Sequence, residues 1–275
     1  MEILVLNLMP NKIETENHLK RSLSKKGEKI NFTFLRTESY QSKNTDPDYL
    51  SQNYKVFSEI SDKTFDGFIC TGAPVENLPF ESVVYIKELN EIMQWARDNT
   101  KSSYYICWGA NAALYYFYGI DKIVYEKKFS GIFEHKILEP NSVTMKGLSG
   151  KIKMPVSRFA GVRKDDIEAT KELSMLLYSS ESGPCLIENK LHKEYYNFNH
   201  FEYDTNTLQN EYVRDINSGM VIDIPKNYFP DNDPNKSPRN CWEKDGAIFF
   251  NNWFWTGKKI RNIKIIIEFY CYISS

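Results

Sequence analysis

The segment Ser103-Tyr-Tyr-Ile-Cys-Trp-Gly-Ala-Asn-Ala-Ala-Leu114 constrains the fold more than any other part of the chain. An aromatic and β-branched run ends at Cys107, a glycine follows two residues later, and a helix-forming run comes next. This order predicts a strand, a sharp turn and a helix, with the thiol at the turn as in a nucleophile elbow. The helix start would favour a thiolate and offer backbone N–H groups to an oxyanion. The alternative is a buried structural cysteine, the commoner role of a free thiol.

Composition excludes several classes of protein. Among 275 residues, 35 Lys and Arg nearly balance 36 Asp and Glu, which argues against a nucleic-acid-binding surface or a basic membrane tether. The five cysteines form no CxxC pair, so neither a metal site nor a disulfide framework is predicted, and a reducing cytoplasm fits best. The apolar start resembles a first strand rather than a signal peptide, and no uncharged run is long enough for a membrane helix.

Strands and helices are expected to alternate in the first half of the chain. A buried strand is predicted at 3–9, an alternating strand at 30–35 and a third strand at 66–72, with amphipathic helices at 11–24 and 82–96. Such alternation implies an α/β fold: a mostly parallel sheet with helices on both faces, in a three-layer sandwich.

The second half is expected to be richer in strands, at 129–133, 176–178, 185–188 and 195–199. A helix is predicted over 204–218, an irregular proline-rich segment over 222–239 and a closing helix over 246–256, before an apolar tail at 260–273. Because no repeat or flexible linker interrupts the chain, we expect one catalytic domain over 1–275.

A cysteine nucleophile needs a base, and the base needs a partner that orients it. His18 and His192 lie in polar surroundings and are expected to be solvated, while His135 could be structural. His200 is followed two residues later by Glu202, and side chains at i and i+2 of a strand share one face. We therefore expect a Cys107–His200–Glu202 triad, which resembles that of class I glutamine amidotransferases.

A wider resemblance covers the chain from about Ile3 to Trp253. Its motifs lie in family order: Leu6-Asn-Leu-Met-Pro-Asn-Lys-Ile-Glu-Thr-Glu16, Thr71-Gly-Ala-Pro-Val-Glu76, Ile106-Cys-Trp-Gly-Ala-Asn-Ala-Ala-Leu114, Gly131-Ile-Phe-Glu-His135, His200-Phe-Glu-Tyr203, Glu211-Tyr-Val-Arg-Asp215 and Ile224-Pro-Lys-Asn-Tyr-Phe229. These look like the homoserine O-acyltransferases of methionine biosynthesis, which have a class I glutamine amidotransferase-like, flavodoxin-like fold.

The resemblance implies a role for each matching residue. Cys107 would carry the acyl group as a thioester, His200 would be the general base, and Glu202 its partner. Lys128 and Ser157 would contact substrate, and Arg214 would hold the amino-acid carboxylate.

The resemblance also addresses the acyl donor. Glu76 falls where the family separates donors, and a carboxylate there would leave room for acetyl while repelling succinyl. The backbone N–H groups of Gly72 and Trp108 would hold the oxyanion.

Some stretches depart from the family pattern. From the resemblance we expect the usual N-terminal extension of the family to be absent here. The segments Val156-Ser-Arg-Phe-Ala-Gly161, Asn199-His-Phe-Glu202 and Trp242-Glu-Lys-Asp245 differ from the usual sequences. They resemble shorter members that acetylate serine, so serine is the first alternative acceptor.

The predicted activity is an acetyl-CoA-dependent homoserine O-acetyltransferase that works by a ping-pong route through acetyl-Cys107. Acetyl-CoA would be a co-substrate, with no resident cofactor or metal, and the partners would be small molecules rather than nucleic acid or membrane. The family suggests a cytoplasmic homodimer. Alternatives are a succinyltransferase, a glutaminase-type hydrolase and an inactive binding protein of the same fold.

Overall fold

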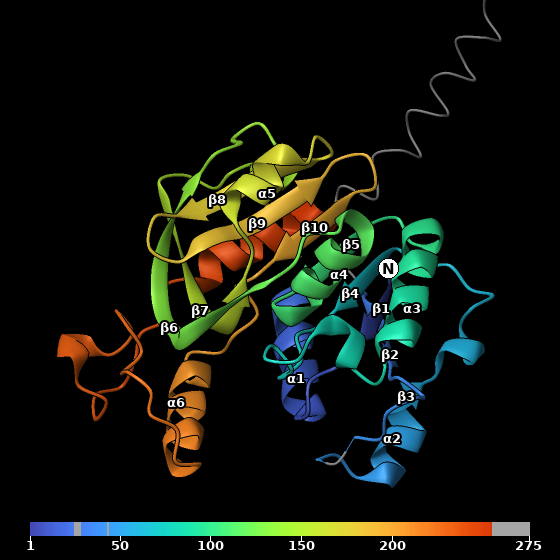
Figure 1. Ribbon diagram of the computed structural model, residues 1–275, viewed down its shortest axis with the longest axis horizontal. Helices are drawn as coiled ribbons and strands as arrows, with labels where there is room; N and C mark the ends of the chain where they lie inside the picture. Colours follow the sequence, from blue (N-terminus) through green and yellow to red (C-terminus); the bar gives the residue numbers. More distant parts are fainter. Residues whose placement is uncertain (25–28, 43, 255–275) are drawn as a thin grey trace, which may run out of the picture.

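The computed structural model of the chain describes residues 1–24, 29–42 and 44–254, and they build one ten-stranded sheet flanked by helices (Figure 1). The strands are β1 (Glu2–Leu6), β2 (Asn31–Leu35), β3 (Tyr54–Lys55), β4 (Gly67–Cys70), β5 (Ser103–Ile106), β6 (Ile123–Ile137), β7 (Lys151–Gly161), β8 (Leu173–Ser179), β9 (Gly183–Asn189) and β10 (Glu194–Asn197). The helices are α1 (Lys12–Leu23), α2 (Pro47–Asn53), α3 (Ile86–Asn99), α4 (Trp108–Tyr118), α5 (Lys164–Ala169) and α6 (Thr207–Asn217), and residues 243–254 are also helical.

The sheet is parallel in its first part and antiparallel in its second. Its order is β3-β2-β1-β4-β5-β10-β9-β8-β6-β7, and every pairing from β3 to β10 is parallel. Leu35, Leu6, Cys70 and Tyr105 stand side by side in register across β2, β1, β4 and β5. The carboxyl ends of these strands therefore meet at one edge, where α1 and α2 begin (Figure 1).

Alternation along the strands divides the core into two layers. On β1, Leu4 and Leu6 pack with α3 and α4, whereas Ile3 and Val5 face α1 and the helix at 243–254. This arrangement confirms the predicted three-layer α/β sandwich with a mostly parallel sheet.

Several element boundaries differ from the sequence-based expectation. Helix α3 begins at Ile86 rather than at 82, because Phe80–Ser82 form a separate 3₁₀ turn. The segment before Tyr54 contains α2, a helix that was not predicted, whose N-cap Asp46 accepts hydrogen bonds from the Asp48 and Tyr49 amides.

Larger differences lie in the second half of the chain. The strand predicted at 129–133 is part of the much longer β6, and its partner β7 was not predicted. Helix α6 begins at Thr207 rather than at 204, with Asn206 at its N-cap and no capping side chain. The closing helix starts at 243, and the apolar tail at 260–273 lies outside the described residues.

The single-domain expectation stays a prediction, although one sheet runs through the described residues. Within that part of the chain, no helix has the length and apolarity required to cross a bilayer. Nor do three or more potential metal-binding side chains gather there.

Candidate active site

Cys107 lies at the turn between β5 and α4, as the sequence predicts. Its backbone has φ 52° and ψ −115°, a conformation that residues with a side chain rarely adopt. The Cys107 amide donates to the Asn197 carbonyl at 2.7 Å, and the Asn111 side-chain amide donates to the Cys107 carbonyl at 3.2 Å. The neighbouring strand β10 and helix α4 thus hold the strained residue in place.

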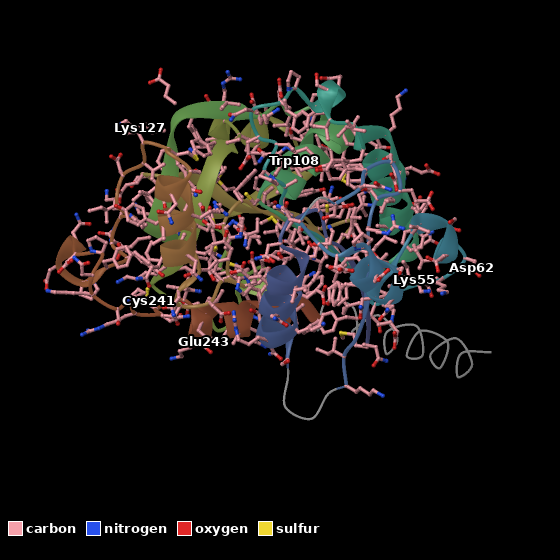
Figure 2. All side chains as sticks on the ribbon, turned by 90° about the horizontal axis from the view of Figure 1, so that it is seen from below. Lys55, Asp62, Trp108, Lys127, Cys241 and Glu243 are labelled. Carbon is pink, nitrogen blue, oxygen red and sulfur yellow. The ribbon has the colours of Figure 1, made fainter. Side chains whose placement is uncertain are left out.

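Two glycines allow the elbow to pack closely. A Cβ on Gly109 would lie 2.6 Å from the Thr71 carbonyl oxygen, so only glycine lets α4 approach the end of β4 so closely. A Cβ on Gly72 would lie 3.2 Å from the Cys107 Cβ, so the loop after β4 passes directly beside the thiol. Trp108, at the start of α4, is fully buried inside the molecule (Figure 2).

His200 and Glu202 form the second part of the site. The His200 Nδ1 lies 2.6 Å from the Glu202 Oε1, and both side chains are buried. They lie beyond β10, which ends at Asn197, so the expected strand geometry is wrong although the contact is formed. The turn itself is fixed by the His200 amide, which donates to the Pro155 carbonyl at 3.0 Å.

The electrostatics of His200 favour its protonated form. Burial acts to lower the pKa of His200, but the Glu202 carboxylate and the Cys107 side chain outweigh it and raise the pKa to about 10. The other ring nitrogen, Nε2, has no hydrogen-bond partner within the described residues. The structure therefore brings Cys107, His200 and Glu202 together, with an imidazole N–H available to the thiol or to a ligand.

Aromatic packing fixes the plane of the imidazole. Tyr203 stacks on His200 with ring centroids 4.0 Å apart and an interplanar angle of 18°. His200, Glu202 and Tyr203 line a cavity of about 230 Å³ that Thr71 and Gly72 also border, and we call it the catalytic cavity.

The two expected oxyanion donors border the elbow. Trp108 is the first residue of α4, so its N–H has no partner within the helix. In the described part of the chain, neither this N–H nor that of Gly72 donates a backbone hydrogen bond. Both amides are thus free to receive an oxyanion beside Cys107.

Glu76 belongs to the same electrostatic environment. Burial raises the pKa of its carboxyl, the nearby Glu211 adds to this effect, and Lys128 and His200 oppose it. Glu76 therefore lies close enough to His200, Lys128 and Glu211 for their charges to act on its carboxyl group.

A network of charges joins β6, β7 and α6. Lys128 is largely buried, and its ammonium lies 2.7 Å from the Asp215 carboxylate and 3.6 Å from that of Glu211. The Ser157 hydroxyl donates to Glu211, as does the Tyr203 hydroxyl at 2.7 Å. Lys128 and Ser157 are thus linked to the ring that covers His200.

Arg214 lies at the rim of the catalytic cavity. Its Nε and Nη2 donate to the Asp215 carboxylate at 2.9 and 2.6 Å, and 64% of its side chain is exposed. It therefore presents a guanidinium that a ligand entering the cavity can reach.

Of the other three histidines, one is exposed and two are buried. His192 is exposed, as expected. His135 is fully buried and its Nε2 lies 2.9 Å from the Asn199 side-chain nitrogen, a structural role. The expectation that His18 is solvated is wrong: it is 6% exposed, lines the catalytic cavity and lies 3.3 Å from the Thr207 hydroxyl.

The sequence did not predict a role for Tyr203, Glu211 or Asp215. A signal for the two acids was present, since Glu211 and Asp215 are four residues apart and so share one face of α6. No periodic pattern marks Tyr203, whose position depends on the turn after β10.

The fold has many solved relatives. A protein described as SMU.1228c aligns with a TM-score of 0.61 at 16% identity, covering 92% of this chain and 99% of the other. A glutamine amidotransferase from Methylobacillus flagellatus aligns with a TM-score of 0.59 at 11% identity, covering 93% and 94%. At such identities the similarity establishes a class I glutamine amidotransferase-like fold and nothing more.

Sequence comparison is far more specific. A family profile described as "Homoserine O-succinyltransferase" matches residues 1–259. Proteins named "Homoserine O-acetyltransferase" from Methanomassiliicoccus intestinalis and Rhizobium leguminosarum bv. trifolii are 47% and 43% identical over 253 residues, which are 92% of this chain and 82% of each relative. The Thermotoga neapolitana protein of that name is 46% identical, with 92% and 83% covered. The chain therefore belongs to the homoserine O-succinyltransferase family.

Proposed function

We propose that this protein is an acetyl-CoA-dependent L-homoserine O-acetyltransferase that forms O-acetyl-L-homoserine through an acetyl-cysteine intermediate. One observation carries the proposal: a buried imidazole, hydrogen-bonded to Glu202, stands beside the thiol of a strained elbow. That arrangement suits acyl transfer through a covalent thioester. The names of the relatives support homoserine as the acceptor and acetyl as the acyl group.

The first half-reaction would acetylate Cys107. Because the pKa of His200 is raised to about 10, the ring would be an imidazolium at neutral pH, and its charge would stabilise the Cys107 thiolate that attacks. The thiolate attacks the thioester carbonyl, and the amides of Gly72 and Trp108 hold the oxyanion. As the intermediate collapses, the bond to the CoA sulfur breaks and the His200 proton passes to that sulfur.

The second half-reaction would transfer the acetyl group to the acceptor. His200, now neutral, takes the proton from the acceptor hydroxyl, and that oxygen attacks the acetyl-cysteine carbonyl. The bond to the Cys107 sulfur then breaks, which restores the imidazolium–thiolate pair.

Glu76 supports acetyl rather than succinyl as the acyl group. Its carboxylate lies in the electrostatic range of His200, so a succinyl chain on Cys107 would bring a second carboxylate toward it. Two like charges about 4 Å apart repel by roughly 1 kcal/mol in water and by about 4 kcal/mol at a protein surface. This repulsion favours the uncharged acetyl group, although the family description mentions succinyl.

The acceptor would bind between α6 and the catalytic cavity. Arg214 would hold its carboxylate, and Lys128 and Ser157, which contact Asp215 and Glu211, would also contact the substrate. Homoserine exceeds serine by one methylene, which alone discriminates by about 1–3 kcal/mol. Serine therefore remains the alternative acceptor. A cytoplasmic location and a homodimer, both suggested by the family resemblance, belong to the same proposal.

Replacing Glu202 with Gln should lower the pKa of His200 and slow both half-reactions, because the imidazolium loses its counter-charge. In ¹⁵N NMR spectra at about pH 8, wild-type His200 should be protonated and the variant largely neutral. The pKa of His200 is higher in the folded protein than in the unfolded chain, where it is about 6.5. Protonation of His200 therefore stabilises the folded state fully below about pH 6.5, and this contribution is lost as the pH rises toward 10.

His135 provides an internal control for this titration. Burial lowers the pKa of His135 to about 4, so its ring should be neutral in both proteins and its NMR signals should be the same in each. A His200 that titrates near 6.5 in the wild type would contradict the proposed ion pair.

Replacing Glu76 with Gly should raise kcat/KM for succinyl-CoA by about 5-fold or more, since about 1 kcal/mol of repulsion and some bulk are removed. Steady-state kinetics with both donors would measure the change. Glu81→Gly, at an exposed carboxylate in the same β4–α3 connection, should leave the donor ratio unchanged. Equal use of the two donors by the wild type would refute the donor assignment.

Replacing Arg214 with Ala should raise the acceptor KM by about 10- to 100-fold, as expected for loss of a charged hydrogen-bonding partner. Acetylation of Cys107 by acetyl-CoA should be nearly unchanged, because that step precedes acceptor binding. Arg214→Lys keeps the charge but not the bidentate fork, so its KM for the acceptor should lie between those of the wild type and Arg214→Ala.

The same kinetics should be recorded with homoserine and with serine. A higher wild-type kcat/KM for serine would overturn the choice of acceptor. An unchanged KM in Arg214→Ala would show that the arginine does not bind the carboxylate.

A further inference from the structure

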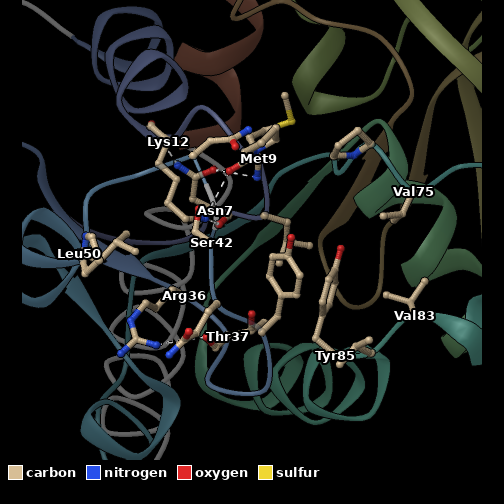
Figure 3. Close-up of a pocket in the computed structure, with 18 of the residues that line it drawn as sticks. Asn7, Met9, Lys12, Arg36, Thr37, Ser42, Leu50, Val75, Val83 and Tyr85 are labelled. Carbon is tan, nitrogen blue, oxygen red and sulfur yellow. Dashed lines mark hydrogen bonds between the residues drawn. The ribbon is translucent and has the colours of Figure 1, made fainter.

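A second and larger cavity lies beside the catalytic cavity, and neither half-reaction of the proposed function has a residue in it. Its volume is about 550 Å³, within the range of small-molecule sites. Met9, Pro10 and Asn44 border both cavities, so the two are neighbours along the carboxyl edge of the sheet. Figure 3 shows this larger cavity, which we call the donor cavity.

Among the described residues, the charged side chains that line the donor cavity are both cations. Lys12 and Arg36 line it, and no Asp or Glu is among the described residues of its wall. Arg36 is half-buried, donates to the Thr37 carbonyl at 3.3 Å, and has no carboxylate within ion-pair distance among the described residues. A half-buried guanidinium without a carboxylate suits a phosphate ligand, which its planar fork can bind with two hydrogen bonds.

Lys12 adds a second positive charge but is held by the protein itself. Its ammonium donates to the Asn7 carbonyl at 2.6 Å and to the Met9 carbonyl at 3.3 Å (Figure 3). Burial, together with the nearby Arg36, lowers the pKa of Lys12 to about 8. A bound anion would relieve the repulsion between these two cations.

The opposite wall is apolar and aromatic. Val75, Val83 and Tyr85 face Arg36 across the cavity in Figure 3. Tyr40 lies against Tyr85 with ring centroids 5.8 Å apart and remains 43% exposed. The cavity thus offers a cation to phosphate, an apolar surface to an alkyl-amide chain and an exposed ring on which a base can stack.

The sheet register sets the separation between this cation and the nucleophile. Arg36 is the first residue after the in-register row of Leu35 and Tyr105, and Cys107 is the second. Three strand spacings separate β2 from β5, or about 14 Å at 4.7–4.9 Å each.

The pantetheine arm of CoA matches this separation. About thirteen bonds join its thioester sulfur to the first phosphorus, the length of roughly four extended peptide residues or about 15 Å. An acyl-CoA with its thioester at Cys107 and its arm along the sheet edge would therefore place its pyrophosphate near Arg36.

We propose that the donor cavity binds the pantetheine arm and pyrophosphate of acyl-CoA, with Arg36 as the phosphate-binding residue and the Val75–Tyr85 wall against the arm. This inference rests on the proposed function, because it assigns a place to that reaction's donor. It also accounts for the position of Glu76, one residue beyond Val75, where the arm would enter the catalytic cavity.

The test compares acetyl-CoA with S-acetylpantetheine, which has the same arm and thioester but no phosphate. Acceptor-free acetylation of Cys107 is followed by mass spectrometry in the wild type, Arg36→Ala and Arg36→Lys. With acetyl-CoA, Arg36→Ala should lose about 10- to 100-fold in the second-order rate constant, and Arg36→Lys should lose less. With S-acetylpantetheine, all three proteins should react alike, which also shows that the variants are folded.

Arg163→Ala is the matched control, because Arg163 is an exposed arginine on the connection after β7. It should react with both donors as the wild type does. Equal losses with the two donors in Arg36→Ala, or no loss with acetyl-CoA, would overturn the inference and leave the proposed function standing. A wild type that neither donor acetylates at Cys107 would instead reject the proposed function.

Discussion

The site depends on one strained residue, Cys107, whose backbone has positive φ between a parallel strand and a helix. Such a conformation costs about 1–3 kcal/mol and persists only where the surroundings enforce it. Here the Asn197 carbonyl accepts the Cys107 amide, and Gly72 and Gly109 allow the close packing that encloses the turn. The strain lifts the thiol to the sheet edge, and the register of β2, β1, β4 and β5 then sets its distance from every other group at that edge.

Nearby charges determine the protonation of His200 and the kind of ligand that each part of the sheet edge suits. Burial acts to lower the pKa of His200, yet the Glu202 carboxylate and the Cys107 side chain outweigh it and raise the pKa of the ring to about 10. The acidic pair of α6, held by Lys128, extends the charged region toward the rim. The donor cavity has the opposite character, with two cations and no described carboxylate. Along one sheet edge, the molecule thus separates a region suited to phosphate from one suited to a zwitterionic amino acid.

The sequence predicted what depends on local chemistry. The glycine two residues after Cys107 marked the elbow, and the alternation of strands and helices indicated the three layers. It predicted the contact between His200 and Glu202 for a wrong reason, because the pair lies in a turn that a hydrogen bond to Pro155 fixes. The position of Tyr203 and the burial of His18 could not be predicted, since both depend on contacts between distant segments. The donor cavity was missed because Arg36, Val75 and Tyr85 line one cavity only when β2 and β4 lie on either side of β1.

In the proposed reaction, Cys107 carries the acetyl group between donor and acceptor. The most direct test of this role is mass spectrometry of the wild-type protein after mixing with acetyl-CoA in the absence of any acceptor. We expect one added acetyl group on the peptide that contains Cys107, and its loss when homoserine is added, with O-acetylhomoserine released in equal amount. A Cys107→Ala protein that still forms O-acetylhomoserine at the wild-type rate, or a wild type that never gains the acetyl group, would contradict it.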